Sequence, residues 1–210
     1  MNQLPGKLIV FEGVEGCGKT TQSELLSKYF YDNQVDHLLV REPGGTETGE
    51  KIRSILLHSE ELNGLSELFL LSAARQILIS QKVLPALESG KIVISDRFYF
   101  SSLSYQGHAR GIDQSIIWDI SKIAAMQINP DIAFLIDISP AQSFSRKIND
   151  KKDRFERESS EFHTAVREGY LSIANSNQNL WRIIQGDKNI IDVHEEIIFL
   201  LNEKLSLISE

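Results

Sequence analysis

A glycine-rich segment directly after an apolar run constrains this chain more than any other feature. The run is Leu8–Phe11, and the segment fits G-x-x-x-x-G-K-[ST] as Gly13-Val14-Glu15-Gly16-Cys17-Gly18-Lys19-Thr20. In such a loop the glycines let backbone N–H groups curl around a phosphate chain, and the helix behind it adds the positive end of its dipole. We therefore expect a site for a nucleoside triphosphate, in which Lys19 reaches the outer phosphates and the Thr20 hydroxyl ligates Mg²⁺.

Length and composition limit the classes of protein that remain. The 210 residues, 41% hydrophobic and 24% charged, predict one globular domain over residues 1–210. No segment approaches the ~20 apolar residues of a membrane span, and no signal-peptide pattern precedes the loop. The single cysteine, Cys17, is expected to be a small spacer in the loop. One cysteine cannot form an intramolecular disulfide, which suits the reducing cytoplasm. A net charge of −7 argues against nucleic acid as the main partner.

Apolar runs alternate with helical patterns along the whole chain, which predicts a parallel sheet covered on both faces. The expected strands are Leu8–Phe11, His37–Arg41, Ile92–Ser95, Ile132–Ile138 and Trp181–Ile184. The expected helices are Thr20–Tyr31, Thr48–Leu57, Ser66–Glu88, Asp113–Ile128, Pro140–Lys147, Phe162–Ser176 and Asn189–Leu205. The fold class is therefore α/β, with a doubly wound sheet of five parallel strands flanked by helices and a short basic lid.

A carboxylate stands at the end of the third expected strand. Asp96 follows Ile92–Ser95, and open α/β sheets bind their ligands at the carboxyl ends of the strands. We expect Asp96 to organise Mg²⁺ beside Thr20, directly or through water, and Arg97 to project over the same crevice. A simple helix-capping role is the alternative for Asp96.

Two further arginines predict a second anion site facing the first. Arg53 lies on the helix after the Arg41-Glu42-Pro43-Gly44-Gly45-Thr46 turn, and Arg75 lies inside the long apolar helix. Phosphoryl transfer needs donor and acceptor in line, with the developing charge neutralised by Mg²⁺, lysine and arginine. The Ser101–Gly107 segment downstream carries hydroxyls, an amide and a ring that could contact a base and a sugar, although it could equally be a polar helix start.

The segment from Arg146 to Arg157 is the one compositional shift in the chain, because six basic residues crowd into it. A lid that closes over phosphates is the preferred interpretation, and a solvated charged loop is the alternative.

Together these segments resemble the bacterial thymidylate kinases. The matching segments occur in that family's order, and they are Phe11–Thr21, Arg41–Thr46, Ala73-Ala74-Arg75, Asp96-Arg97, Ser101–Gly107 and Asp153-Arg154-Phe155-Glu156. The resemblance implies a P-loop NTPase-type kinase that transfers a phosphoryl group from ATP to dTMP, giving dTDP, with Mg²⁺ as cofactor. It also implies a homodimer.

The resemblance also implies roles for individual residues. ATP would contact Gly13, Val14, Glu15, Gly16, Cys17, Gly18, Lys19, Thr20 and Thr21. Arg53 and Arg97 would hold the dTMP phosphate, and Glu15 would lie near the sugar 3′-hydroxyl. Tyr105 would crowd the 2′ position, while Arg75, Ser102 and Gln106 would read the thymine edge. Pro43, Leu71 and Ser101 complete the expected acceptor site.

Two departures from the family pattern matter. The family usually places a phenylalanine one helical turn before the arginine that corresponds to Arg75, and this chain has Leu71 there. Members without an arginine in the phosphate loop normally carry one in the lid. Because this chain has Glu15 in the loop and Lys151-Lys152 at the lid centre, the catalytic lid cation could be Arg146, Lys151 or Lys152.

Two other functions compete with a thymidylate kinase. Another nucleoside monophosphate kinase, or a deoxynucleoside kinase, would share the fold, and a single methyl group contributes only ~1–3 kcal/mol of discrimination. A GTPase-type switch would show Asp-x-x-Gly and Asn/Thr-Lys-x-Asp, and neither pattern occurs in the 210 residues.

Overall fold

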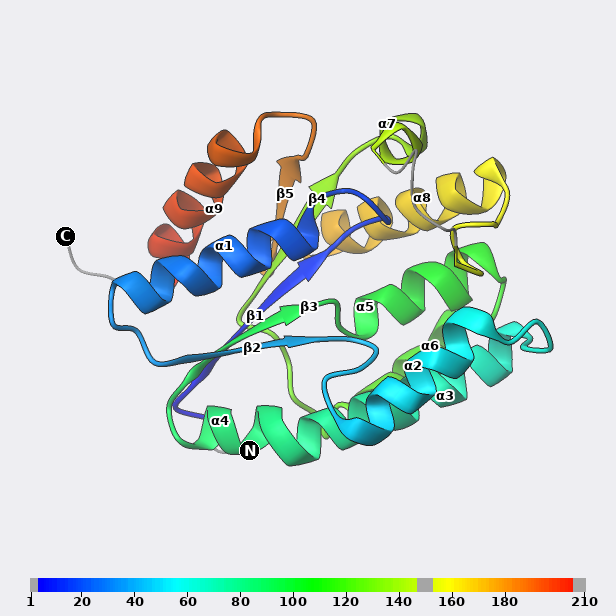
Figure 1. The fold of residues 1–210 in the computed structure, drawn as a ribbon, viewed down its shortest axis with the longest axis horizontal. Helices are drawn as coiled ribbons and strands as arrows, with labels where there is room; N and C mark the ends of the chain where they lie inside the picture. The colour runs from blue at the N-terminus through cyan, green and yellow to red at the C-terminus, as the bar shows by residue number, and fades with distance from the viewer. Residues whose placement is uncertain (1–3, 147–152, 206–210) are drawn as a thin grey trace.

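A central five-stranded parallel sheet organises the molecule, as the alternating sequence pattern predicts (Figure 1). The computed structural model describes residues 4–146 and 153–205. The strand order is β2-β3-β1-β4-β5. The strands are β1 (Lys7–Glu12), β2 (His37–Arg41), β3 (Ile92–Asp96), β4 (Ile132–Asp137) and β5 (Trp181–Gln185).

Helices cover both faces of this sheet. α1 packs against β1, β2 and β3 and beside α9, while α4 and α8 pack against the opposite face (Figure 1). All residues of β3, and all but the last of β4, are buried, because strands between two helical layers have no solvent-facing side. The helices are α1 (Lys19–Asp32), α2 (Glu47–His58), α3 (Gly64–Leu78), α4 (Leu84–Glu88), α5 (Tyr99–Ser102), α6 (Gln114–Ala124), α7 (Pro140–Ser145), α8 (Ser160–Ser176) and α9 (Ile190–Leu205).

The predicted long helix over Ser66–Glu88 is divided in the structure. It begins at Gly64 behind the side-chain cap of Asn63, and a π-helical turn, η1 (Ile79–Val83), separates α3 from α4. Pro85 explains the division, since a proline ring inside a helix clashes with the carbonyl four residues earlier and removes one hydrogen-bond donor.

Two other expected helices also have different limits. The one over Asp113–Ile128 ends as α6 at Ala124, because Met126 and Gln127 adopt positive φ angles of 50° and 61°. The one over Pro140–Lys147 ends as α7 at Ser145, and Lys147 lies outside the described residues. The Ser101–Gly107 segment spans the end of α5 and a second π-helical stretch, η2 (Leu103–Ala109).

Candidate active site

The phosphate-loop motif forms the turn between β1 and α1, at the carboxyl edge of the sheet. Gly13 has a φ of 142°, and a Cβ there would lie 2.6 Å from the Ile136 carbonyl oxygen, so no larger residue fits. Gly18, at φ 103°, caps α1, which begins at Lys19. The strand–turn–helix context expected for the motif is therefore present.

Thr20 and Asp96 meet at this edge. The Thr20 hydroxyl donates a 2.5 Å hydrogen bond to Asp96 Oδ2, and Asp96 Oδ1 is buried with no hydrogen-bond partner among the described residues. An orphaned carboxylate oxygen beside a threonine hydroxyl is the kind of oxygen pair that Mg²⁺ accepts when substrate phosphates supply other ligands. The residues present therefore fit the metal that the loop motif implies.

A crevice opens above the loop, and we call it the phosphate crevice. Lys19 enters it nearly buried, and within the described residues its ammonium donates only to the Val14 carbonyl, at 3.2 Å. The crevice is lined by Glu15, Gly16, Gly18, Lys19, Thr20, Thr21, Arg41, Glu42, Arg53, Asp96, Arg97, Arg146, Asp153 and Glu156.

Arg97 is held in a fixed orientation directly after β3. Its backbone adopts a φ of 73°, which turns the side chain over the phosphate loop. The guanidinium donates to Glu15 Oε1 at 2.6 Å and to the hydroxyls of Ser101 and Tyr170 at 3.0 Å each. Burial lowers the pKa of Arg97, but the Glu15 carboxylate and, together with it, Tyr105, Tyr170 and Glu12 raise it, and the pKa lies well above its ordinary value.

Tyr105 contacts both members of the Arg97–Glu15 ion pair. Its hydroxyl donates a short hydrogen bond to Glu15, and the Arg97 guanidinium lies 5.3 Å from the centre of its ring. Burial raises the pKa of Tyr105 well above its ordinary value, so the phenol keeps the proton that it donates.

A fully buried carboxylate, Glu12, supports these residues from below. It ends β1 and accepts hydrogen bonds from the Phe98 backbone at 2.8 Å, from the Ser101 hydroxyl at 2.7 Å and from the Tyr170 hydroxyl at 2.9 Å. Burial raises its pKa, and Arg97 opposes that rise. Glu12, Phe98 and Tyr170 were not predicted as site residues, since no local sequence pattern shows that they converge.

Arg75 lies in the wall of a second cavity, which we call the inner pocket. Its Nε donates to Glu42 Oε2 at 2.7 Å and its Nη2 donates to the Ser102 hydroxyl at 3.3 Å, while Nη1 is buried without a partner among the described residues. Burial raises the pKa of Glu42 to about 7, and the Arg75 charge opposes the rise. Ser102 is fully buried behind Arg75 and does not line the pocket, so it reaches the pocket only through the arginine.

Arg53 projects from α2 toward the same cavity. Its guanidinium donates to the Pro43 carbonyl at 3.0 Å. Burial and the neighbouring Arg41 lower its pKa. A cluster of partly desolvated guanidinium groups in a crevice binds anions well, because an anion that enters supplies the negative charge that these groups lack.

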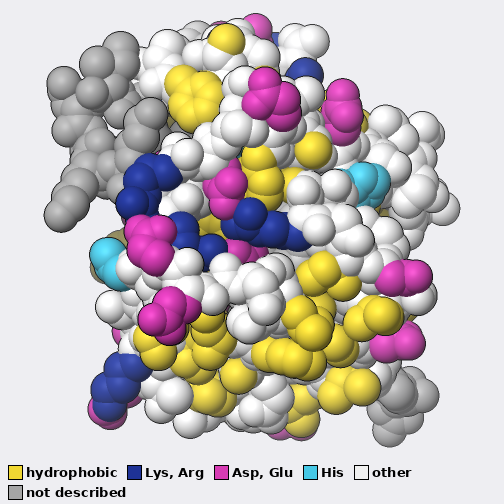
Figure 2. Space-filling view, turned by 90° about the vertical axis from the view of Figure 1, so that its right-hand side faces the viewer, with side chains coloured by type: hydrophobic (Ala, Val, Ile, Leu, Met, Phe, Trp, Pro, Cys, Tyr) yellow, Lys and Arg dark blue, Asp and Glu magenta, His cyan; other side chains and the backbone are white. Residues whose placement is uncertain are grey.

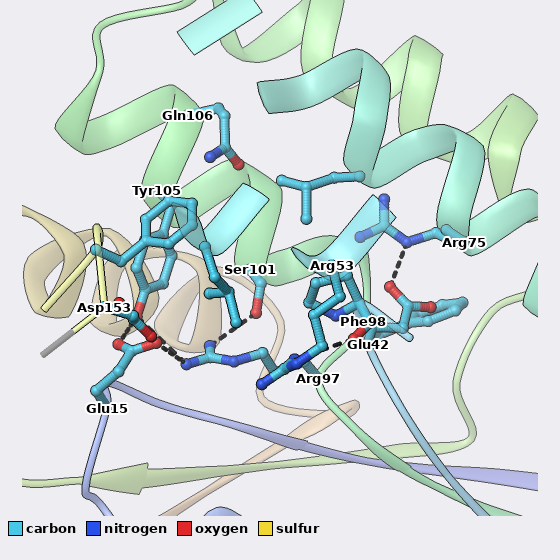
Figure 3. A pocket seen from close by; sticks show the side chains of 14 residues that line it. Glu15, Glu42, Arg53, Arg75, Arg97, Phe98, Ser101, Tyr105, Gln106 and Asp153 are labelled. Atoms are coloured by element: carbon cyan, nitrogen blue, oxygen red, sulfur yellow. Dashed lines mark hydrogen bonds and ion pairs between the residues drawn. The ribbon is translucent and has the colours of Figure 1, made fainter. Parts of the chain in front are cut away.

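The inner pocket brings together most of the residues expected for the acceptor site. Side chains from the turns after β1, β2 and β3 and from α2, α3 and η2 point into it (Figure 3). Its lining consists of Glu15, Glu42, Pro43, Arg53, Leu57, Leu71, Arg75, Arg97, Phe98, Ser101, Tyr105, Gln106, Asp153 and Phe155. Glu42, Leu57, Phe98, Asp153 and Phe155 had not been assigned from the sequence, although the first and the last two stand within or beside motifs of the resemblance.

The ends of the basic segment are described, and they lie in different surroundings. Arg146 donates to the Gly186 carbonyl at 2.8 Å, beside the phosphate-loop backbone. Arg154 is buried and donates to Glu67 at 2.6 Å, so it belongs to the interior. Lys151 and Lys152, the two other expected lid cations, lie outside the described residues.

A third cavity, the outer pocket, opens on the other side of the phosphate loop. It is formed by Gly16, Cys17, Gly18, Thr21, Gln22, Arg146, Gly186, Lys188, Asn189, Ile190, Ile191 and Val193. Residues 186–193 were not predicted as part of the site, although their position directly after β5, at the same sheet edge as the phosphate loop, could have indicated it.

Comparisons with known proteins agree with this geometry. The thymidylate kinase family model matches residues 11–197. The thymidylate kinase of Thermoanaerobacter sp. (strain X514) is 41% identical over 203 residues, covering 96% of this chain and 100% of that protein. The one from Caldanaerobacter subterraneus subsp. tengcongensis is 42% identical, covering 96% of this chain and 98% of that protein.

A solved structure extends the agreement to three dimensions. The thymidylate kinase from Ehrlichia chaffeensis matches with a TM-score of 0.77 and 35% identity, covering 93% of this chain and 98% of that chain. The family match spans the phosphate loop, the residues that line the inner pocket and the phosphate crevice, and strands β2 to β5. The chain belongs to the thymidylate kinase family.

Proposed function

We propose that this protein transfers the γ-phosphoryl group of ATP to dTMP, giving dTDP and ADP. The observation that carries the proposal is the junction of the two cavities. The inner pocket and the phosphate crevice share five lining residues, namely Glu15, Glu42, Arg53, Arg97 and Asp153. A donor on the phosphate loop and an acceptor in the inner pocket would therefore meet phosphate to phosphate between two arginines, as in-line transfer requires.

The donor half of the reaction is assigned to the phosphate loop and the outer pocket. The N–H groups of residues 13–21 and Lys19 would hold the phosphates, and the outer pocket would hold the adenine base. Thr20 and the free oxygen of Asp96 would hold Mg²⁺. When bound, the metal would neutralise the negative charge that develops on the phosphates during the transfer.

The acceptor half is assigned to the inner pocket. Arg53 and Arg97 would bind the dTMP phosphate, whose oxygen forms the new bond to phosphorus while the bond to the ADP leaving group breaks. This oxygen is already anionic, so the step needs no residue to remove a proton. Glu15 and Tyr105 would border the sugar, where Tyr105 would exclude a 2′-hydroxyl.

The base end of the inner pocket carries the remaining assignments. Arg75, steadied by Ser102, and Gln106 would read the thymine edge, with Leu71 against the ring. Arg146, Lys151 or Lys152 would supply the cation that meets the transferring group when the basic segment closes. The contacts of Arg146 with Gly186 and the loop carbonyls favour a place beside the adenine for this residue.

We further propose that residues 1–210 form one domain and that two copies associate. The described helices pack on one sheet around one core.

Apolar side chains gather on the lower part of the face shown in Figure 2, the side where α2, α3 and α6 lie in Figure 1. Exposed apolar residues on these helices are Ile55, Leu65, Phe69, Ile116, Trp118 and Ile123. No described helix is long and apolar enough to cross a bilayer.

An acceptor panel tests the proposed reaction. Purified protein with ATP and Mg²⁺ is offered dTMP, dUMP, UMP, dCMP and AMP, and ADP production is followed. We expect dTMP to give the highest kcat/KM. Faster turnover of UMP or AMP than of dTMP would contradict the assignment. In a parallel incubation with GTP and no acceptor, slow GTP hydrolysis would indicate a switch protein instead.

A further inference from the structure

A buried carboxylate on α3 has no place in the assignments above. Glu67 is fully buried, and four donors surround it. Gln106 and Arg110 donate to its Oε2 at 2.9 and 3.3 Å, and Arg110 and Arg154 donate to its Oε1 at 2.9 and 2.6 Å. Both guanidinium groups can only donate, and a carboxylate paired with two such cations accepts hydrogen bonds at both of its oxygens.

This chemistry fixes the direction of the Gln106 amide. A glutamine side chain has one accepting and one donating end, and either could face a cavity. Because Glu67 can only accept hydrogen bonds, the Gln106 group that faces it must be the donating NH₂ group. The Gln106 carbonyl oxygen is thereby turned away from Glu67, and it is buried with no partner among the described residues. Figure 3 shows that the amide end of Gln106 points into the inner pocket.

Arg75 offers a hydrogen-bond donor in the same pocket in which Gln106 offers an acceptor. Glu67, Leu71 and Arg75 recur every fourth residue of α3, so they share one face of the helix. The Nη1 group of Arg75 is buried without a partner among the described residues, and a guanidinium can only donate. Leu71 and Arg75 both line the inner pocket, at whose edge Gln106 stands.

A base that satisfies both groups must offer an acceptor and a donor side by side. Thymine does so with its O4 and its N3–H. Cytosine offers the reverse, an N4 donor and an unprotonated N3 acceptor. The Arg75 donor would then face a donor, and the Gln106 oxygen would face an acceptor. A site discriminates strongly against an analogue that leaves its buried polar groups without hydrogen-bond partners. This discrimination is far larger than that of an apolar pocket against one methyl group.

We propose that Glu67 is a positioning residue for base selection: by accepting from the Gln106 NH₂ group it holds the Gln106 oxygen toward N3–H of the base, and so excludes cytosine nucleotides. This inference rests on the proposed function, because it requires a pyrimidine monophosphate in the inner pocket. Glu67 itself touches no substrate and acts only through Gln106.

The substitution Glu67→Gln tests the proposal. Arg110 and Arg154 would attract the oxygen of the new side chain, so its NH₂ group would face Gln106. Gln106 would then turn its oxygen away from the pocket and present its NH₂ group there. We expect the ratio of kcat/KM for dTMP to that for dCMP to fall about tenfold or more, as the reversal of one net hydrogen bond predicts. The ratio of dTMP to dUMP should stay unchanged, since uracil has the same N3–H and O4 edge.

Arg110→Gln is the matched control. It removes two donors from Glu67 and the 2.6 Å ion pair with Glu158, but keeps the acceptor for Gln106. It should lower the melting temperature while the dTMP-to-dCMP ratio stays at the wild-type value. If Glu67→Gln does not fold, the double variant Glu67→Gln/Arg154→Gln also removes the buried cation that has lost its ion pair with Glu67, and it is measured instead.

The outcomes separate this inference from the function on which it rests. A wild-type protein that phosphorylates dTMP and rejects dCMP, together with a variant whose ratio is unchanged, overturns the role of Glu67 and leaves the kinase assignment intact. A wild-type protein that does not phosphorylate dTMP overturns the kinase assignment itself. An equal fall of the ratio in Arg110→Gln would also overturn the inference, because it would show that any loosening of the network relaxes selection.

Discussion

Arg97 and Glu15 form a 2.6 Å ion pair that joins the turn after β3 to the phosphate-binding loop. The pair is mostly shielded from solvent, with side chains 12% and 20% exposed. Since Ser101 and Tyr170 also accept from Arg97, its orientation is set by the protein alone. A preorganised guanidinium needs little rearrangement when a phosphate arrives, which is the arrangement expected of a group that stabilises a transition state.

Arg97→Lys should therefore be severely impaired, although it keeps the positive charge. An ammonium group lacks the planar fork that reaches Glu15, Ser101 and Tyr170 at once. We expect kcat/KM for dTMP to fall roughly a hundredfold or more. Arg167→Lys, at a bidentate pair with Asp137 that lies outside the three pockets, is the matched control. Normal kinetics in Arg97→Lys would mean that the acceptor phosphate binds elsewhere.

Lys19→Ala should abolish turnover without unfolding the protein. Within the described residues the Lys19 ammonium donates only to the Val14 carbonyl, so its removal costs little stability. In the proposed reaction its charge would act where negative charge develops on the transferring group, so the loss should reach several powers of ten in kcat. Steady-state rates and thermal melts of the same preparation measure both effects. More than a tenth of wild-type activity would contradict the phosphate-loop assignment.

Glu42 should make stability depend on pH. Burial raises its pKa from 4.5 to about 7, so the folded protein holds this proton more tightly than the unfolded chain does. The resulting stabilisation is complete below about pH 4.5 and is lost as pH rises through 7. The neutral Glu42→Gln variant lacks this loss. Relative to wild type, its free energy of unfolding should therefore rise between pH 5 and 8.

Urea denaturation at pH 5, 6, 7 and 8 measures this difference. Glu47→Gln controls for the removal of one negative charge, since Glu47 is exposed on α2 and contacts only Lys51 among the described residues. A difference between Glu42→Gln and wild type that stays constant over the range would show that Arg75 keeps Glu42 ionised throughout.

Much of the fold could be predicted because it depends on short-range patterns. Each strand is an unbroken apolar run, and each of the five lies within a residue or two of its expected limits. The phosphate loop has a fixed spacing, and Asp96 follows directly from its place at the end of a strand. Features of this kind need only the local sequence and the rule that parallel strands end at one sheet edge.

The supporting contacts could not be predicted, since they join residues far apart in the chain. Glu12 accepts from Tyr170, and Glu67 accepts from Gln106 and Arg154, yet no spacing pattern links these positions. Arg154 shows the consequence most clearly. Its charge counted toward a basic lid in the sequence, but the fold buries it against Glu67 in the interior.

The remaining cations of the basic segment can be separated by single substitutions. Arg146, Lys151 and Lys152 are each replaced by Gln, and kcat is compared with the ATP dissociation constant. Because a lid cation acts on the transferring group, we expect at least one lysine variant to lose kcat far more than ATP affinity. Arg146→Gln should instead weaken ATP binding, given its place beside the outer pocket. Three variants close to wild type would favour a solvated loop.

Leu71 allows the sharpest test of the inner pocket as a site for a base, because it stands where the family usually has phenylalanine. Its side chain is half-buried in the wall of the inner pocket, four residues before Arg75 on α3. Stacking of a base on an aromatic ring contributes ~1–3 kcal/mol by alanine substitution. Leucine already covers part of the ring by apolar contact, so the deficit should be nearer ~1 kcal/mol, about fivefold in affinity.

Leu71→Phe should therefore bind dTMP severalfold more tightly in calorimetric titration, with little change for ATP. Leu65→Phe is the matched control, since Leu65 lies on the same helix, 45% exposed and outside the inner pocket. Phe69 offers no substitute ring, because it lies two positions away, about 200° around the helix, and is 56% exposed. Weaker or unchanged dTMP binding in Leu71→Phe would instead show that Leu57, Phe98 and Phe155 have closed the pocket around leucine, leaving a larger ring to overpack it.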